Sequence, residues 1–235
     1  MAHRGLSTLY PENTALAYTK AAQAGAYSIE CDIQATSDGE FVCYHNGSLS
    51  TAVSLLTSKN GSYLWNYEKE IILSGFRYDA DYLREKQALI STESFTDDEL
   101  KICSLEDYLG ICRAYHIWPQ IDIKHMYAPD FTIDELAEKL VRILASYGFT
   151  DMNCSLSSGK QVWLTAVAKA SDYKVLIIPG SDSQDSYYTT AELEETAEYA
   201  ASDGYIQPSE LPDCFTNGIA SVSSDYDYIA AHPLN

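Results

Sequence analysis

Two acidic residues, Glu30 and Asp32, stand one residue apart inside the otherwise apolar stretch 29–33. Successive side chains of a β-strand point to opposite faces, so an extended stretch here has an apolar face and a carboxylate face. Two carboxylates side by side on a strand repel each other, and a bound divalent cation removes that repulsion. This short stretch therefore predicts a strand with one face for a core and the other for a cation.

A turn signal follows this strand and predicts where a histidine lies. Asp38-Gly39 stands between two strand-like stretches and is a strong indicator of a hairpin. If the turn centres on these two residues, Asp32 lies opposite His45, with their Cβ atoms about 5 Å apart on one face. The expectation depends on the register, because a shift of one residue turns His45 to the other face.

A second strand-like stretch, 120–124, repeats the alternation and places Asp122 and Lys124 on one face. A carboxylate and an ammonium side by side suit a third metal ligand beside a phosphate-binding cation. Each feature alone has an ordinary explanation: a solvent-facing edge, a structural histidine or a surface ion pair. Together with His3 and Arg4 at the head of the chain, these explanations would require four separate coincidences.

Helical and strand-like stretches alternate along the chain, which predicts an α/β fold with a largely parallel sheet. The expected helices are 12–24, 105–115, 133–147, 159–171 and 190–202, and the expected strands are 28–34, 41–45, 118–124, 153–156 and 174–179. The polar, Tyr- and Ser-rich stretch 50–99 breaks this rhythm and is interpreted as an insertion near the site or a small cap. No linker divides the chain, so we expect one domain over residues 1–235.

Composition excludes some classes of partner. The chain has 15 basic and 34 acidic residues, and a net charge of −19 argues against nucleic acid, whose phosphates need basic contacts. An anionic small substrate stays open, because a bound divalent ion reverses the local charge. No stretch approaches the ~18 continuous apolar residues of a membrane span. Six cysteines without C-x-x-C spacing suit a reducing compartment. We expect a cytoplasmic location; the alternative is export, directed by a signal upstream of Met1. A first strand upstream of Met1 is a separate expectation.

Beyond these patterns, the sequence resembles the glycerophosphodiester phosphodiesterase family. The resemblance is highly specific over residues 3–46, good through residue 124 and thin afterwards. It rests on His3-Arg4-Gly5, Pro11-Glu12-Asn13-Thr14, Ala24-Gly25, Glu30-x-Asp32, Thr36-x-Asp38-Gly39, His45, Ser104-Leu105-Glu106-Asp107 and Asp122-x-Lys124. The last of these stands where the family has Glu-x-Lys.

The resemblance implies an irregular TIM-like (β/α) barrel that lacks most of its first strand and carries an inserted small cap at about 50–99. It implies metal-dependent hydrolysis of glycerophosphodiesters to glycerol 3-phosphate and an alcohol. Carried over residue by residue, the resemblance makes His3 and His45 the catalytic acid/base pair. It makes Glu30, Asp32 and Asp122 the metal ligands, and Arg4 and Lys124 the cations that bind the phosphate. Imidazoles titrate in the range that this chemistry needs, and three hard oxygen ligands favour Ca²⁺ or Mg²⁺.

Three departures from the family pattern keep alternatives open. Asn46 follows the second histidine where the family has Asp, Asp122 replaces Glu, and the tail 218–235 lacks the family's Trp-Thr-Val-Asn. One alternative is a catalytically silent phosphate- or metal-binding homologue. Another is a sphingomyelinase D-like phospholipase, in which the third ligand is an Asp. The tyrosines around 63–82 either cup a choline headgroup by cation–π contact or pack the insertion.

Overall fold

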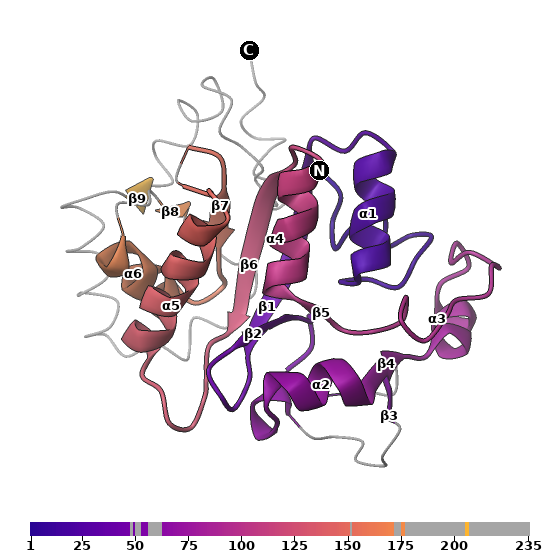
Figure 1. The fold of residues 1–235 in the computed structure, drawn as a ribbon, viewed down its shortest axis with the longest axis horizontal. Coiled ribbons are helices and arrows are strands. Elements are labelled where there is room, and N and C mark those ends of the chain that lie inside the picture. Colours follow the sequence, from indigo (N-terminus) through magenta and orange to yellow (C-terminus); the bar gives the residue numbers. More distant parts are fainter. Residues whose placement is uncertain are drawn as a thin grey trace, which may run out of the picture.

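The central feature of the fold is a mixed five-stranded sheet with strand order β5-β2-β1-β6-β7 (Figure 1). The structure is a computed structural model that describes residues 1–47, 49, 53–55, 63–150, 152–171, 175–176 and 205–206. The strands of this sheet are β1 Ser28–Ala35, β2 Phe41–Cys43, β5 Cys103–Ser104, β6 Trp118–His125 and β7 Ser155–Ser157. β1 is parallel to β6, and β6 is parallel to β7, whereas β2 is antiparallel to both β1 and β5. The predicted α/β class is confirmed, but the sheet, which was predicted to be largely parallel, is mixed.

Four helices accompany this sheet, and their starts follow from the sequence. They are α1 Ala15–Gln23, α4 Leu105–Ala114, α5 Ile133–Ser146 and α6 Gln161–Ala170. Thr14, Ser104 and Thr132 cap the first three with side-chain hydrogen bonds, which satisfy backbone donors left free at a helix start. Helix α1 begins later than predicted because Thr14 is its cap. The helix predicted at 190–202 lies outside the described residues.

The main hydrophobic core lies between the sheet and these helices. On β1 its members are Ile29, Cys31, Ile33 and Ala35, all fully buried. They pack with Tyr18 of α1 and Tyr108 of α4 among others. The intervening acidic residues of β1 do not belong to this core. The predicted division of the strand into an apolar face and a carboxylate face is therefore confirmed.

The insertion has a small core of its own. Its described elements are β3 Val53–Leu55, η1 Leu64–Asn66, α2 Lys69–Gly75, β4 Phe76–Tyr78 and α3 Ala80–Lys86. The second cluster of buried side chains extends from β2 into these elements. Tyr67 packs edge-on against Phe76, and Tyr78 lies beside Tyr44. Packing inside the insertion therefore accounts for Tyr67 and Tyr78.

The described strands leave the main sheet open, so a closed TIM-like barrel stays a prediction. Near the N-terminus, Ala2 pairs in parallel with Ile29 at the start of β1. Two short strands, β8 Val175–Leu176 and β9 Tyr205–Ile206, pair with each other in parallel. The tail departure at 218–235 lies outside the described residues. Among the helices that the structure describes, none is both long and apolar enough to cross a membrane.

Candidate active site

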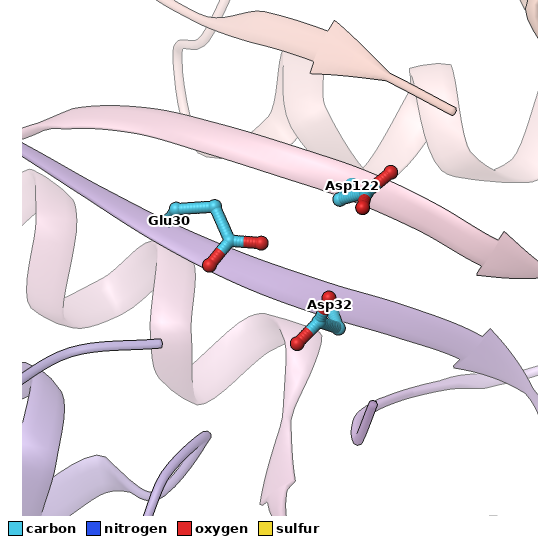
Figure 2. Close-up of side chains that lie close together, drawn as sticks. All are labelled: Glu30, Asp32 and Asp122. Atoms are coloured by element: carbon cyan, nitrogen blue, oxygen red, sulfur yellow. The ribbon is translucent and has the colours of Figure 1, made fainter. Parts of the chain in front are cut away.

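Three carboxylates converge on one face of the sheet. β1 and β6 run in parallel with Asp32 beside Asp122, and Glu30 precedes Asp32 by two residues on the same face. One oxygen of each of the three lies within 4.8 Å of the others (Figure 2). Glu30 and Asp32 are buried, whereas Asp122 is partly exposed. The structure thus brings together the three residues predicted as metal ligands.

The electrostatics of this group fit a divalent cation. Burial, together with the neighbouring Asp32 and Asp122, raises the pKa of Glu30 to about 8, against a backbone hydrogen bond from Arg4 that lowers it. Asp32 Oδ1 is buried and lies 3.2 Å from the Lys124 ammonium, with no second hydrogen-bond donor among the described residues. Hard carboxylate oxygens in mutual repulsion are a suitable donor set for Ca²⁺ or Mg²⁺. The residues present therefore fit such an ion.

Lys124 reaches this group because of an irregularity in β6. Ile33 pairs with Ile123, but Gln34 pairs with His125, so Lys124 is an extra residue on its strand. Such a bulge redirects side chains and is frequent beside active sites. The Lys124 ammonium lies 3.2 Å from Asp32 Oδ1 and also pairs with Asp122. Burial alone would lower the pKa of Lys124, but the two carboxylates outweigh it and raise the pKa.

Arg4 connects the start of the chain to the acidic group. Its backbone N–H donates to Glu30 Oε2 at 2.8 Å, its Nε lies 3.0 Å from Asp32 Oδ2, and its Nη1 donates to Glu12 Oε2 at 2.9 Å. Burial would lower the pKa of Arg4, but Asp32 and Glu12 raise it overall. The guanidinium is therefore held charged beside the predicted metal ligands.

The backbone around Arg4 is a tight turn in the left-handed region. Arg4 has φ 56° and Gly5 has φ 80°, which only glycine adopts without strain. A Cβ added to Gly5 would lie 2.7 Å from the carbonyl carbon of Ala17, so a side chain would collide with α1. A non-glycine residue with positive φ is strained, and such strain is typical of functional sites. This turn positions both His3 and Arg4 against β1.

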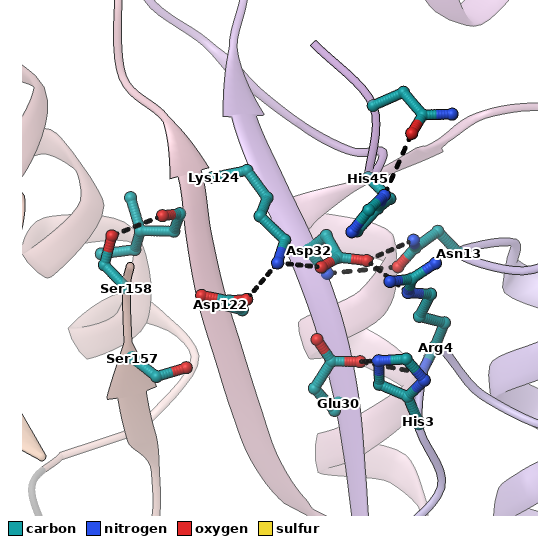
Figure 3. A network of polar contacts seen from close by, with 12 residues as sticks. His3, Arg4, Asn13, Glu30, Asp32, His45, Asp122, Lys124, Ser157 and Ser158 are labelled. Atoms are coloured by element: carbon teal, nitrogen blue, oxygen red, sulfur yellow. Dashed lines mark hydrogen bonds and ion pairs between the residues drawn. The ribbon is translucent and has the colours of Figure 1, made fainter. Parts of the chain in front are cut away.

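His3 lies at the edge of the group. Its Nε2 is 3.8 Å from Glu30 Oε2, and 60% of its side chain is exposed. Burial and the neighbouring Arg4 charge lower the pKa of His3 from its usual value of 6.5. Figure 3 shows the ring beside Glu30, on the side from which Arg4 also approaches. A largely neutral, solvent-accessible imidazole can exchange protons with a ligand.

The predicted register that paired Asp32 with His45 is wrong. The observed pairs are Ile33 with Cys43, Gln34 with Val42 and Ala35 with Phe41. The loop has three residues, 37–39, because Thr36 N–H donates to Glu40 O and Gly39 takes φ 69°. Three-residue hairpin loops of this kind commonly end in a left-handed residue. The extra loop residue shifts the register by one, and Tyr44 N–H donates to Asp32 O.

His45 nevertheless lies at the site, two residues after β2 ends at Cys43. Figure 3 shows its ring directed toward the side of the sheet that carries Asp32 and Arg4. Its Nδ1 is 3.1 Å from Asn46 Oδ1. The departure at Asn46 thus replaces a negative neighbour of the imidazole with a neutral hydrogen-bond acceptor.

Sequence reasoning assigned no role to Asn13, which supports Asp32 directly. Its Nδ2 donates to Asp32 Oδ2 at 2.8 Å, and its Oδ1 accepts from the Tyr18 hydroxyl at 2.8 Å and the Asp32 N–H at 3.2 Å. Asn13 is fully buried and has φ 55°. In the sequence, Asn13 stood out only as part of the family motif Pro11-Glu12-Asn13-Thr14. That motif does not indicate that Asn13 contacts Asp32.

Comparison with known proteins places the chain in a family. Residues 3–205 match the glycerophosphoryl diester phosphodiesterase family, so the chain belongs to it. A probable glycerophosphodiester phosphodiesterase of Mycobacterium tuberculosis is 43% identical over 61 residues, 25% of this chain and 22% of that protein. A glycerophosphodiester phosphodiesterase of Arabidopsis thaliana is 28% identical over 134 residues, 52% of this chain and 36% of that protein. The chain thus aligns with well under half the length of these relatives.

Solved structures share the fold. An Oleispira antarctica phosphodiesterase, in complex with its product sn-glycerol-3-phosphate, superimposes with a TM-score of 0.59 at 18% identity, covering 98% of this chain and 94% of that one. A glycerophosphodiester phosphodiesterase from Thermotoga maritima gives a TM-score of 0.56 at 20% identity, covering 100% of this chain and 89% of that one.

Proposed function

We propose that this chain hydrolyses glycerophosphodiesters to glycerol 3-phosphate and an alcohol, with a divalent metal and two histidines. The observation that carries the proposal is the convergence of Glu30, Asp32 and Asp122 within 4.8 Å, in a chain of this family. A binding face alone would not need two imidazoles beside the acids. The named product of the Oleispira antarctica relative agrees with this substrate class.

The three carboxylates would hold Ca²⁺ or Mg²⁺. Such an ion, when bound, supplies Lewis-acid polarisation of the phosphate oxygens. Asp122 is one methylene shorter than the Glu of the family pattern. Since Asp122 lies directly beside Asp32 on the neighbouring strand, the shorter side chain still reaches the same group.

Two cations at the site would bind the phosphodiester. Arg4 presents a guanidinium that Asp32 and Glu12 hold in place, and Lys124 presents an ammonium between Asp32 and Asp122. Charge on the non-bridging phosphate oxygens grows during displacement, and fixed cations stabilise it.

His3 and His45 would transfer the protons. Cleavage requires one group to remove a proton from the attacking oxygen and another to protonate the leaving alcohol. The lowered pKa of His3 leaves it neutral near pH 7, as a base must be. In Figure 3, His3 and His45 lie on opposite sides of the Arg4 guanidinium.

We also propose that the described sheet is part of an irregular TIM-like barrel forming one domain with an inserted cap.

The test is turnover of glycerophosphocholine by the full chain with Ca²⁺, with Mg²⁺ and with a chelator. We expect glycerol 3-phosphate and choline with one of the metals and none with the chelator. A folded protein that binds the metal but releases no product with either ion would contradict the proposal and indicate a silent homologue. A cyclic phosphate product from a lysophospholipid would instead indicate phospholipase D-like chemistry.

A further inference from the structure

Gln34 holds the backbone on both sides of His45. Its Nε2 donates to the carbonyl oxygen of Tyr44 at 2.7 Å and to that of Asn46 at 2.5 Å. A primary amide has two N–H donors, so both are used on the two peptide units that flank His45. Gln34 is fully buried and shares the carboxylate face of β1 with Glu30 and Asp32.

These two hydrogen bonds replace the sheet ladder where it ends. β2 ends at Cys43, and among the described residues the backbone bond from Tyr44 to Asp32 is the last one between the two strands. Without further support, His45 would begin a loop. The Gln34 amide supports the chain across this point, so the α-carbon of His45 is fixed from within the sheet.

The ring of His45 has its own support from the same segment. Asn46 Oδ1 lies 3.1 Å from Nδ1, so an acceptor there favours the tautomer with its proton on Nδ1. That tautomer leaves Nε2 as the atom able to accept a proton. Gln34 holds the carbonyl of Asn46, and it thereby holds the residue that orients the imidazole.

A purely structural role for Gln34 explains these contacts less well. Its Oε1 is buried and has no hydrogen-bond partner among the described residues. A buried polar atom without a partner destabilises a fold, and an apolar residue of similar volume would avoid that cost. Stability alone therefore does not favour glutamine at this position, whereas two donors aimed at the flanking carbonyls require an amide.

We propose that Gln34 is a positioning residue for His45, acting through the carbonyl groups of Tyr44 and Asn46. The inference rests on the proposed catalytic role of His45. It adds a residue that touches neither substrate nor metal and controls the direction of the imidazole. Gln34→Met, similar in volume and without donors, removes the two hydrogen bonds.

The experiment compares the full-length wild type with Gln34→Met, His45→Ala and the double variant, using glycerophosphocholine and the preferred metal. We expect Gln34→Met to lower kcat about 10- to 100-fold, as is typical of residues supporting a catalytic group, with KM changed less than about threefold. In the His45→Ala background the same change should have little further effect, because residues that act as a unit are not additive. An equal loss in both backgrounds would overturn the proposal.

A measurement independent of turnover separates this inference from the proposed function. The ¹⁵N shifts of His45 in the chelated protein should show the Nδ1-protonated tautomer in wild type and a mixture in Gln34→Met. Asn46→Ala is the matched control and should give the same mixture. Unchanged shifts in Gln34→Met would overturn the inference. Absence of turnover in the wild type would refute the proposed function, and the shifts would still decide whether Gln34 orients the ring.

Discussion

The two strands that carry the acidic group hold their carboxylates very differently. Asp32 on β1 is fully buried and is contacted by Asn13, Arg4 and Lys124. Asp122 on β6 is partly exposed, and among the described residues the contact recorded for its side chain is with Lys124. Both strands run in register, so the difference arises from what packs around each side chain and not from the backbone.

This comparison indicates a fixed half and an adjustable half of the site. The fixed half is the N-terminal part of the site, where the strained turn at Arg4 and the buried Asn13 lie against β1. The adjustable half is β6, where the bulge at Lys124 redirects one flexible side chain. Ligand exchange should therefore move Asp122 and Lys124, while Glu30 and Asp32 stay in place.

The largest expected effect comes from removing a charge in the fixed half. Asp32→Asn should weaken Ca²⁺ or Mg²⁺ binding more than about 100-fold, beyond the effect usual for residues that only support a ligand. The matched change Asp122→Asn should cost about 10-fold, because the exposed β6 position leaves room for water to replace the lost ligand. Isothermal titration calorimetry measures both, and equal losses would remove the distinction between the halves.

The support of Asp32 gives the next effect. Asn13→Ala removes the donor to Asp32 Oδ2 and should weaken metal binding roughly 10- to 100-fold, the range typical of such supporting contacts. It also leaves the Tyr18 hydroxyl without its acceptor, so the midpoint of denaturation should fall. Tyr18→Phe is the control, since it removes that bond and leaves the contact between Asn13 and Asp32 in place. Comparable loss of metal affinity in Tyr18→Phe would show that Asn13 acts through packing.

The third effect is on stability and depends on pH. The folded-state pKa of Glu30, about 8, lies above the ordinary value of 4.5, so its bound proton stabilises the fold fully below pH 4.5. This stabilisation is lost as pH rises through about 8. In the presence of a chelator and above that pH, Glu30→Gln should raise the free energy of unfolding by about 2 kcal/mol. This figure allows for the weaker hydrogen bond that a neutral amide accepts from the Arg4 N–H.

Urea denaturation at several pH values measures this change. The difference between Glu30→Gln and wild type should vanish below pH 4.5, where Glu30 is protonated in both states. Glu85→Gln serves as a control for a general charge effect, because Glu85 is an exposed residue of α3. A gain independent of pH would mean that burial and repulsion do not act on Glu30 as the geometry indicates.

The smallest effect tests the adjustable half. Asp122→Glu restores the family's longer side chain at a partly exposed position, and we expect metal affinity to change less than about threefold. The opposite exchange in the fixed half, Asp32→Glu, adds a methylene to a fully buried site and should cost far more, because buried sites tolerate added volume poorly. Calorimetry of both variants sharpens the comparison, and equal tolerance would refute it.

Much of the site was predictable where the relevant contacts are local. The alternation of residues 29–33 fixed the faces of β1, since side-chain direction in a strand depends only on position. The helices predicted at 105–115 and 133–147 begin where expected, after Ser104 and Thr132, whose side chains bond within one turn, whereas α1 was predicted to begin three residues too early. The hairpin register failed, because a two-residue and a three-residue loop fit the same Asp38-Gly39 signal.

The chain by itself determined which side chains face the cation site, because strand periodicity and helix capping are set by neighbouring residues. Only the tertiary structure decided that Asn13 reaches Asp32, that a bulge redirects Lys124 and that the Gln34 amide holds the peptides around His45. These contacts join segments separated along the chain. Their geometry depends on how strands and turns pack, which no local pattern encodes.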